Sequence, residues 1–190
     1  IMPVHVYGHP CDMETICAIA ARHGLKILED AAHALPAEWR GRRIGGIGDA
    51  TAFSFYATKN LTTGEGGMLT GDPAFIEKAR LWSLHGMNRD AYKRYSAEGS
   101  WFYEVVLPGF KCNMTDIQAS IGIHQLRKLD GFQRRRREIV RRYRAGLEHC
   151  DALELPVERA GVVHAWHLFV IRLRPDRLQI GRGPFIEELR

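Results

Sequence analysis

The chain has 190 residues and a mass of 21.6 kDa, with 45% hydrophobic and 26% charged side chains. These ordinary globular values exclude a disordered chain, a coiled coil and a fibrous repeat. The length predicts one domain plus part of another. Because the chain starts at Ile1 in a strand-like run and stops at Arg190 in the first turns of a helix, we expect a fragment of a longer protein.

The net charge of +5 and the pI near 9.2 suit an anionic substrate, a phosphate cofactor or nucleic acid. No apolar run is long enough to span a bilayer, and the first residues do not resemble a signal peptide. We therefore expect a soluble, cytoplasmic protein that does not bind a membrane. The four cysteines form no C-x-x-C pair, which predicts buried free thiols rather than disulfides or a zinc site.

The first thirty residues have the pattern of a strand, a helix and a second strand. Residues 3–7 predict a strand, Asp12 caps a helix that ends before Gly24, and residues 25–28 predict the next strand. This order indicates a βαβ unit in a parallel sheet. Ligands of such sheets bind beyond the carboxyl ends of the strands, and Asp30 follows directly on such an end.

The rest of the chain reads as further strands and helices, with a domain boundary near Cys150. The pattern predicts a loop over 31–49, strands over 50–56 and 67–70, and a helix opened by Asp72-Pro73. It then predicts an extended run over 103–107, a helix capped by Thr115 and an arginine-rich helix over 133–147. A linker or edge over 153–159 and a strand over 167–173 follow. In the last of these strands apolar and polar residues alternate, whereas the earlier strands have the pattern typical of a parallel sheet.

Three segments carry residues suited to pyridoxal phosphate: EDAAHA from Glu29, SFYATKN from Ser54 and TTGEGG from Thr62. Lys59 stands at the exit of a strand, where a rigid position and a lowered pKa would let its amine attack a carbonyl. Asp30 could keep the pyridine nitrogen protonated. Ser54 and the glycine-rich turn could supply donors to the phosphate, and His33 could lie against the ring.

The segments EDAAHA, GDATAFSFYATKN, TTGEGGMLTGD and CNMTDIQASIG, in this order, resemble the sugar-nucleotide aminotransferase family of DegT/StrS type. The resemblance implies an α/β fold, that of the pyridoxal-phosphate-dependent aspartate aminotransferases. Residues 1–150 would be the C-terminal half of the large cofactor-binding domain, a mainly parallel sheet flanked by helices. Residues 151–190 would begin a small α+β domain. The earlier half of the family's large domain has no counterpart here.

Carried over residue by residue, the resemblance implies that Lys59 forms the Schiff base, Asp30 pairs with the pyridine nitrogen and Ser54 contacts the phosphate. His33 would lie beside the cofactor ring, where many relatives carry Gln. Asn113 would reach the phosphate of the partner subunit, which implies a homodimer with shared active sites. The dehydratase branch of the family carries His in place of Lys59, so the lysine favours transamination.

The implied function is pyridoxal-phosphate-dependent transamination of a keto sugar nucleotide with glutamate as amino donor, in polysaccharide or antibiotic sugar biosynthesis. A cyclitol or another keto ring precursor is an alternative substrate. A second alternative is a regulator that binds pyridoxal phosphate without turnover. The fragment itself is expected to be inactive, because part of the large domain and most of the small one are missing.

Two other groups of residues favour structural roles. The arginines between Arg134 and Arg144 could bind nucleic acid, but they share a helix with an apolar stripe and predict a solvated face, so we expect no nucleic-acid partner. Histidines and a cysteine near each other in the chain are expected to be turn and strand residues, not metal ligands: His5, His9, Cys11, His164 and His167. Core or dimer-surface positions are expected for the aromatic run Trp101, Phe102 and Tyr103.

Overall fold

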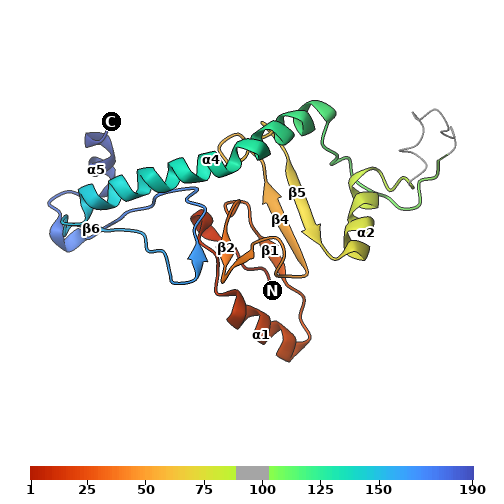
Figure 1. The fold of residues 1–190 in the computed structure, drawn as a ribbon, viewed down its shortest axis with the longest axis horizontal. Helices are drawn as coiled ribbons and strands as arrows, with labels where there is room; N and C mark the ends of the chain where they lie inside the picture. Colours follow the sequence, from red (N-terminus) through yellow and green to blue (C-terminus); the bar gives the residue numbers. More distant parts are fainter. Residues whose placement is uncertain (89–102) are drawn as a thin grey trace.

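The computed structural model describes residues 1–88 and 103–190, with a three-stranded sheet near its centre (Figure 1). Its strands lie in the order β1 (Leu28–Asp30), β4 (Ala50–Ser54) and β5 (Gly67–Gly71). β1 and β4 run parallel, and β5 is antiparallel to β4. The strands expected over 50–56 and 67–70 are thus present, and β1 begins at Leu28 instead of Leu25.

The first residues of the chain extend this sheet on the far side of β1. Val4 forms a parallel bridge with Asp30, so the expected βαβ unit is present. The expected strand over 3–7 is wrong in its second half, where η1 (Val6–Gly8) is a 3-10 turn. Tyr7 has a φ of 60° and Gly8 a φ of 96°, and left-handed backbone cannot continue a strand.

α1 (Met13–His23) joins these two strands, with the ends that the sequence predicts. The Asp12 carboxylate accepts a hydrogen bond from the backbone N of Thr15, and Gly24 ends the helix with a φ of 62°. A buried apolar cluster packs this helix against β1 and the following loop. Its members are Met13, Ala20, Ile27, Ala31, Ala34, Ala37, Trp39, Ile44 and Ala165.

The segment expected as a loop over 31–49 contains two short antiparallel strands, β2 (Glu38–Trp39) and β3 (Arg42–Arg43). β2 also pairs with β7 (Val162–Val163), which joins the early and late parts of the chain. Strands of two residues have no detectable periodicity, so the sequence could not show them.

Beyond β5, α2 (Pro73–Ser83) begins as expected, because the Asp72 carboxylate accepts a hydrogen bond from the backbone N of Ala74 at 3.0 Å. The extended run over 103–107 forms no strand, only an isolated bridge between Val105 and Met87. Of the aromatic run, Trp101 and Phe102 lie outside the described residues. Tyr103 is 40% exposed, so it is not a core residue of this chain.

α4 (Asp116–Leu147) is a single helix of 32 residues whose first half passes one end of β4 and β5 (Figure 1). It replaces the two helices expected from Thr115 onward and over 133–147. Its N-terminus is closed by a capping box, in which Thr115 and Gln118 exchange hydrogen bonds.

The last forty residues form small elements around the end of α4. They are β6 (Leu153–Glu154), β8 (Arg172–Leu173), η2 (Pro175–Arg177) and α5 (Arg182–Glu188), and β6 pairs with β8. The strand expected over 167–173 is reduced to β8. Its first residues bond to the N-terminal turn instead, since the backbone N of His167 donates to the Tyr7 carbonyl at 3.0 Å.

Two further findings concern the expectations from composition. All four cysteines are free thiols, but Cys112 and Cys150 are exposed, so the expectation of buried thiols was wrong for these two. Within residues 1–88 and 103–190, no helix has the length and hydropathy needed to cross a membrane. The domain boundary near Cys150 stays a prediction.

Candidate functional site

The carboxyl ends of the two parallel strands place two expected site residues on one face of the sheet. Asp30 ends β1, Ser54 ends β4, and the register pairs Asp30 with Ala52. Side chains alternate between faces along a strand, so these three residues share a face. Ala52 is exposed, and its small methyl group leaves an open floor between the carboxylate and the hydroxyl.

On the opposite face, Glu29 holds the two strands together. Its Oε1 accepts hydrogen bonds from Thr51 Oγ1 at 2.9 Å and Gly48 N at 2.7 Å, and its Oε2 accepts from His5 Nε2 at 2.9 Å. Burial alone would raise the pKa of Glu29, but these three bonds lower it. The anchored Glu29 fixes β1 in register and so fixes the direction of its neighbour Asp30.

The Asp30 carboxylate is held by only one of its oxygens. Its Oδ1 accepts a hydrogen bond from the backbone N of Ala32 at 3.0 Å. In the described part of the chain, Oδ2 has no hydrogen-bond partner. The side chain is partly buried. It is therefore oriented and still able to accept an N–H from a ring that lies on Ala52.

Lys59 follows β4 in a turn closed by a hydrogen bond from its backbone N to the Tyr56 carbonyl at 3.0 Å. It is partly buried, and among the described residues its Nζ has no hydrogen-bond or ion-pair partner. Burial and the nearby Lys59 charge lower the pKa of His33, whereas Asp30 raises it. Asp30 and Lys59 thus both lie close enough to His33 for their charges to act on its ring.

His33 is held as a neutral ring. Its Nδ1 accepts a hydrogen bond from the backbone N of Tyr7 at 3.2 Å, which requires a lone pair on that nitrogen. The ring stacks on His167, with centroids 4.4 Å apart and an angle of 27° between the planes.

His167 belongs to this group, although the sequence analysis considered it only as a doubtful metal ligand. Its Nδ1 donates to Asn60 Oδ1 at 3.2 Å, while Asn60 Nδ2 donates to the Ala165 carbonyl at 2.7 Å. Burial, His33 and Lys59 lower the pKa of His167 to about 4. Asn60 and His167 are 107 positions apart, so no motif spacing could reveal the pair.

Ser54 lies beside the glycine-rich turn, as expected. Its Oγ accepts a hydrogen bond from the backbone N of Tyr56 at 3.3 Å, which leaves the hydroxyl proton available to another acceptor. The turn is fixed to the end of β4, because the Phe55 N donates to the Gly66 carbonyl at 2.8 Å. The Gly64 N donates to Thr62 Oγ1 at 2.9 Å.

Asn113 is the one expected site residue that the structure does not bring into this group. It is exposed, just before α4, where Lys111 Nζ donates to its Oδ1. Its Nδ2 lies 3.5 Å from the Met114 carbonyl. Among the described residues it makes no hydrogen bond to Asp30 or Lys59, so its expected role would need a second subunit.

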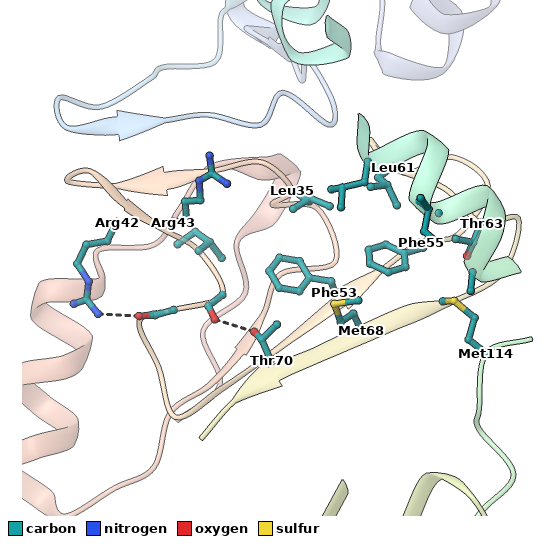
Figure 2. Close-up of a pocket in the computed structure, with 17 residues that line it drawn as sticks. Leu35, Arg42, Arg43, Phe53, Phe55, Leu61, Thr63, Met68, Thr70 and Met114 are labelled. Carbon is teal, nitrogen blue, oxygen red and sulfur yellow. Dashed lines mark hydrogen bonds between the residues drawn. The ribbon is translucent and has the colours of Figure 1, made fainter. Parts of the chain in front are cut away.

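A large apolar cavity of about 760 Å³ lies on the other face of β4 (Figure 2). Phe53 and Phe55, which alternate with Ser54, point into it together with Met68 and Met114. Neither Asp30 nor Lys59 lines this cavity. It lies on the back of the sheet, separate from the polar group at the strand ends.

Two histidines outside the polar group, His5 and His164, make structural contacts. Within the described ranges, no three His, Cys, Asp or Glu side chains are arranged to hold a metal ion. His5 is fully buried against Glu29. His164 stacks on Trp166 with ring centroids 3.8 Å apart, and its Nδ1 accepts a hydrogen bond from the Trp166 N.

Residues 1–190 match the sequence profile of the DegT/DnrJ/EryC1/StrS aminotransferase family. The chain is 56% identical to the uncharacterized protein MJ1066 of Methanocaldococcus jannaschii and 50% identical to the spore coat polysaccharide biosynthesis protein SpsC of Bacillus subtilis. Both alignments cover 100% of this chain, but 50% of MJ1066 and 49% of SpsC. The chain thus spans about half the length of these relatives.

Among solved structures, the chain is similar to the PLP form of a putative sugar aminotransferase, Spr1654 from Streptococcus pneumoniae. The TM-score is 0.82 at 31% sequence identity, over 92% of this chain and 48% of that one. The match confirms the α/β fold expected from the motifs. Because the family profile covers every residue, the chain belongs to the DegT/DnrJ/EryC1/StrS aminotransferase family.

Proposed function

We propose that the protein containing this chain transaminates a keto sugar nucleotide, with pyridoxal phosphate as cofactor and glutamate as amino donor. The observation that supports the proposal is that Asp30 and Lys59 both lie near His33, beyond the carboxyl ends of β1 and β4. Sheets of this kind bind ligands at that edge. The family of the chain supports the reaction class.

The residues present fit pyridoxal phosphate. Asp30 offers an oriented oxygen to the pyridine nitrogen, and the exposed Ala52 leaves room for a flat ring between Asp30 and Ser54. The Ser54 hydroxyl can donate to a phosphate oxygen. Lys59 presents an amine with no partner in the described part of the chain, as covalent attachment to an aldehyde requires.

When bound, pyridoxal phosphate supplies an electron sink for the carbanion formed at the donor's α-carbon. In our proposal, Lys59 Nζ would take the proton from the α-carbon and deliver it to C4′ of the cofactor, and the second half-reaction would run the same transfer backwards. Asp30 keeps a proton on the ring nitrogen. The His33 ring is neutral because its Nδ1 accepts a hydrogen bond, and the pKa of His167 is lowered to about 4, so the two rings add no positive charge beside Lys59.

The substrate class rests on the relatives and on charge. The name of SpsC refers to polysaccharide biosynthesis, and the description of Spr1654 refers to a sugar aminotransferase. The net charge of +5 suits an anionic sugar nucleotide. In the same proposal the enzyme is a homodimer, in which the exposed Asn113 of each subunit reaches the cofactor phosphate of the other.

The direct test uses the whole protein. The purified protein should be yellow. Borohydride should remove the colour and leave a pyridoxyl group on Lys59, which mass spectrometry of the peptide detects. Lys59→Ala should lack both the modification and the activity, whereas Lys78→Ala, an exposed lysine on α2, should keep both. A colourless protein with an intact fold, or a pyridoxyl group on another lysine, would contradict the proposal.

Glutamate separates the enzyme from a regulator that only binds the cofactor. Addition of glutamate alone should convert the protein to the pyridoxamine form and release 2-oxoglutarate in an amount equal to the active sites. A yellow protein whose absorbance glutamate leaves unchanged would be a cofactor-binding regulator.

A further inference from the structure

Four arginines on α4 form a stripe that the proposed transamination does not use. Arg134, Arg137, Arg141 and Arg144 are spaced by three, four and three residues, which places them on one side of a helix. They all line a cavity of about 570 Å³ between α4 and the segment that contains Glu158.

Two arginines on the neighbouring side of the helix differ, because they share a carboxylate partner. Arg135 and Arg142 both pair with Glu138. In residues 1–88 and 103–190, Arg134, Arg137 and Arg141 have no carboxylate partner. Several positive charges therefore face one hollow without compensation from this part of the chain.

The cavity holds one acidic side chain, Glu158, whose Oε1 accepts a hydrogen bond from the backbone N of His164 at 2.9 Å. A single carboxylate, already bonded to the main chain, cannot balance four guanidinium groups. The wall of the cavity thus keeps an excess of positive charge. Anions are attracted to such a concave basic surface more strongly than to a flat one.

Arg144 gives an independent indication of a missing acceptor. Its Nη2 donates to the Pro156 carbonyl at 2.9 Å, and its Cζ lies 5.4 Å from the centre of the Trp166 ring. Its Nε is buried and has no hydrogen-bond partner among the described residues. Buried donors are normally paired, and an unpaired one calls for a bound group or a water.

We propose that this arginine cavity binds a small molecule that carries a phosphate or diphosphate group. Guanidinium groups match phosphate oxygens in paired hydrogen bonds, and the volume lies in the usual range for small-molecule sites. A hollow of this size fits a small ligand, whereas a nucleic-acid duplex needs an extended basic face. Free pyrophosphate and a nucleoside diphosphate both present a diphosphate group, so the experiment has to compare the two. The site would bind its ligand whether or not Lys59 transaminates.

The test measures binding of sodium pyrophosphate and of UDP to the whole protein by calorimetry at constant ionic strength. The double variant Arg137→Gln/Arg141→Gln should raise the dissociation constant of pyrophosphate at least tenfold. The matched control, Arg135→Gln/Arg142→Gln, removes the same charge from the same helix outside the cavity and should change it less than twofold. Tighter binding of UDP would identify a nucleotide as the source, and equal binding would identify the phosphate group alone; both support the site.

Circular dichroism checks that both variants fold; if the cavity double variant does not, the single variant Arg141→Gln should still weaken pyrophosphate binding about threefold. Equal losses in the two double variants would show a diffuse effect of helix charge and overturn the proposal. Absence of pyrophosphate binding to the unmodified protein would also overturn it. The proposal would also be overturned if a DNA duplex bound more tightly than pyrophosphate and if both double variants weakened its binding equally.

Discussion

At Asp30, charge matters more than size, because the carboxylate is already oriented by the Ala32 N–H. Asp30→Asn keeps the shape of the side chain and an oxygen for that bond, but it removes the negative charge that we propose lies opposite the ring nitrogen. The variant should therefore bind the cofactor nearly as well and lose at least about a hundredfold in the rate of the glutamate half-reaction.

Stopped-flow absorbance measures that rate in the whole protein, and titration of the cofactor-free protein measures binding. Asp130→Asn, an exposed position on α4, serves as the control and should change neither. An Asp30→Asn rate within a factor of a few of the unmodified protein would remove Asp30 from its proposed role.

His164 predicts a pH dependence of stability. Burial and the charges of His9 and Arg144 lower its pKa to about 3, whereas in the unfolded chain it titrates near 6.5. The unfolded state therefore binds more protons between pH 6.5 and 3, so this ring lowers stability as pH falls through that range. The slope is up to about 1.4 kcal/mol per pH unit.

His164→Asn tests this slope, because Asn offers an oxygen to the Trp166 N–H but does not titrate. The variant should lose some stability at pH 7, since the ring stack on Trp166 is gone. Between pH 6 and 4.5 its free energy of unfolding in urea should fall less steeply than that of the unmodified protein. Parallel curves would contradict the lowered pKa.

Among the elements, α4 depends on its N-terminal cap. Thr115 Oγ1 accepts from the backbone N of Gln118, and the Gln118 side chain bonds back to Thr115 and also donates to the Glu65 carbonyl at 3.0 Å. The cap thus ties the helix to the glycine-rich turn. Thr115→Ala should lower the free energy of unfolding by about 1 kcal/mol.

Urea unfolding of the whole protein measures the effect of Thr115→Ala. The control is Ser120→Ala in the same helix, where the hydroxyl only bonds back to the Ile117 carbonyl. Because Ala is the better helix former, this control should be neutral or slightly stabilising. If the two variants are equally stable, the capping box contributes nothing measurable.

The helices and strands that the sequence predicted well are those with caps or strong periodicity. Asp12 and Gly24 mark α1, and Asp72-Pro73 opens α2, because these residues act through local bonds. The two helices expected beyond Thr115 are one, since nothing in that stretch breaks the backbone pattern. The strand over 167–173 was over-predicted, because His167 bonds to the N-terminal turn rather than to a sheet.

At the scale of the whole molecule, the chain exposes more surface than a compact protein of its mass. Its accessible surface is 13116 Å², whereas a compact monomer of 21.6 kDa exposes about 9,200 Å². Large apolar side chains contribute to it, among them Phe110, Ile117 and Leu126. The apolar cavity on the back of β4 adds to this uncovered surface (Figure 2).

We therefore expect the isolated 190-residue chain to bind a hydrophobic dye and to show no transamination, in contrast to the whole protein. Exposed apolar side chains and the apolar cavity give such a dye a surface on which to bind. Dye fluorescence and an assay for 2-oxoglutarate measure the two properties side by side. Turnover by the isolated chain would show that it contains a complete active site.

The sequence by itself determined the family and the fold class, and it proposes Asp30, His33, Ser54 and Lys59 as site residues, because local motifs at strand ends carry that chemistry. Only the tertiary structure added His167 and Asn60 to the group and gathered the arginines of α4 around one cavity. Such contacts join residues far apart in the chain, and their distances depend on packing that no local pattern records. The strands β2 and β7 were not predicted, because two residues are too few to show a periodicity.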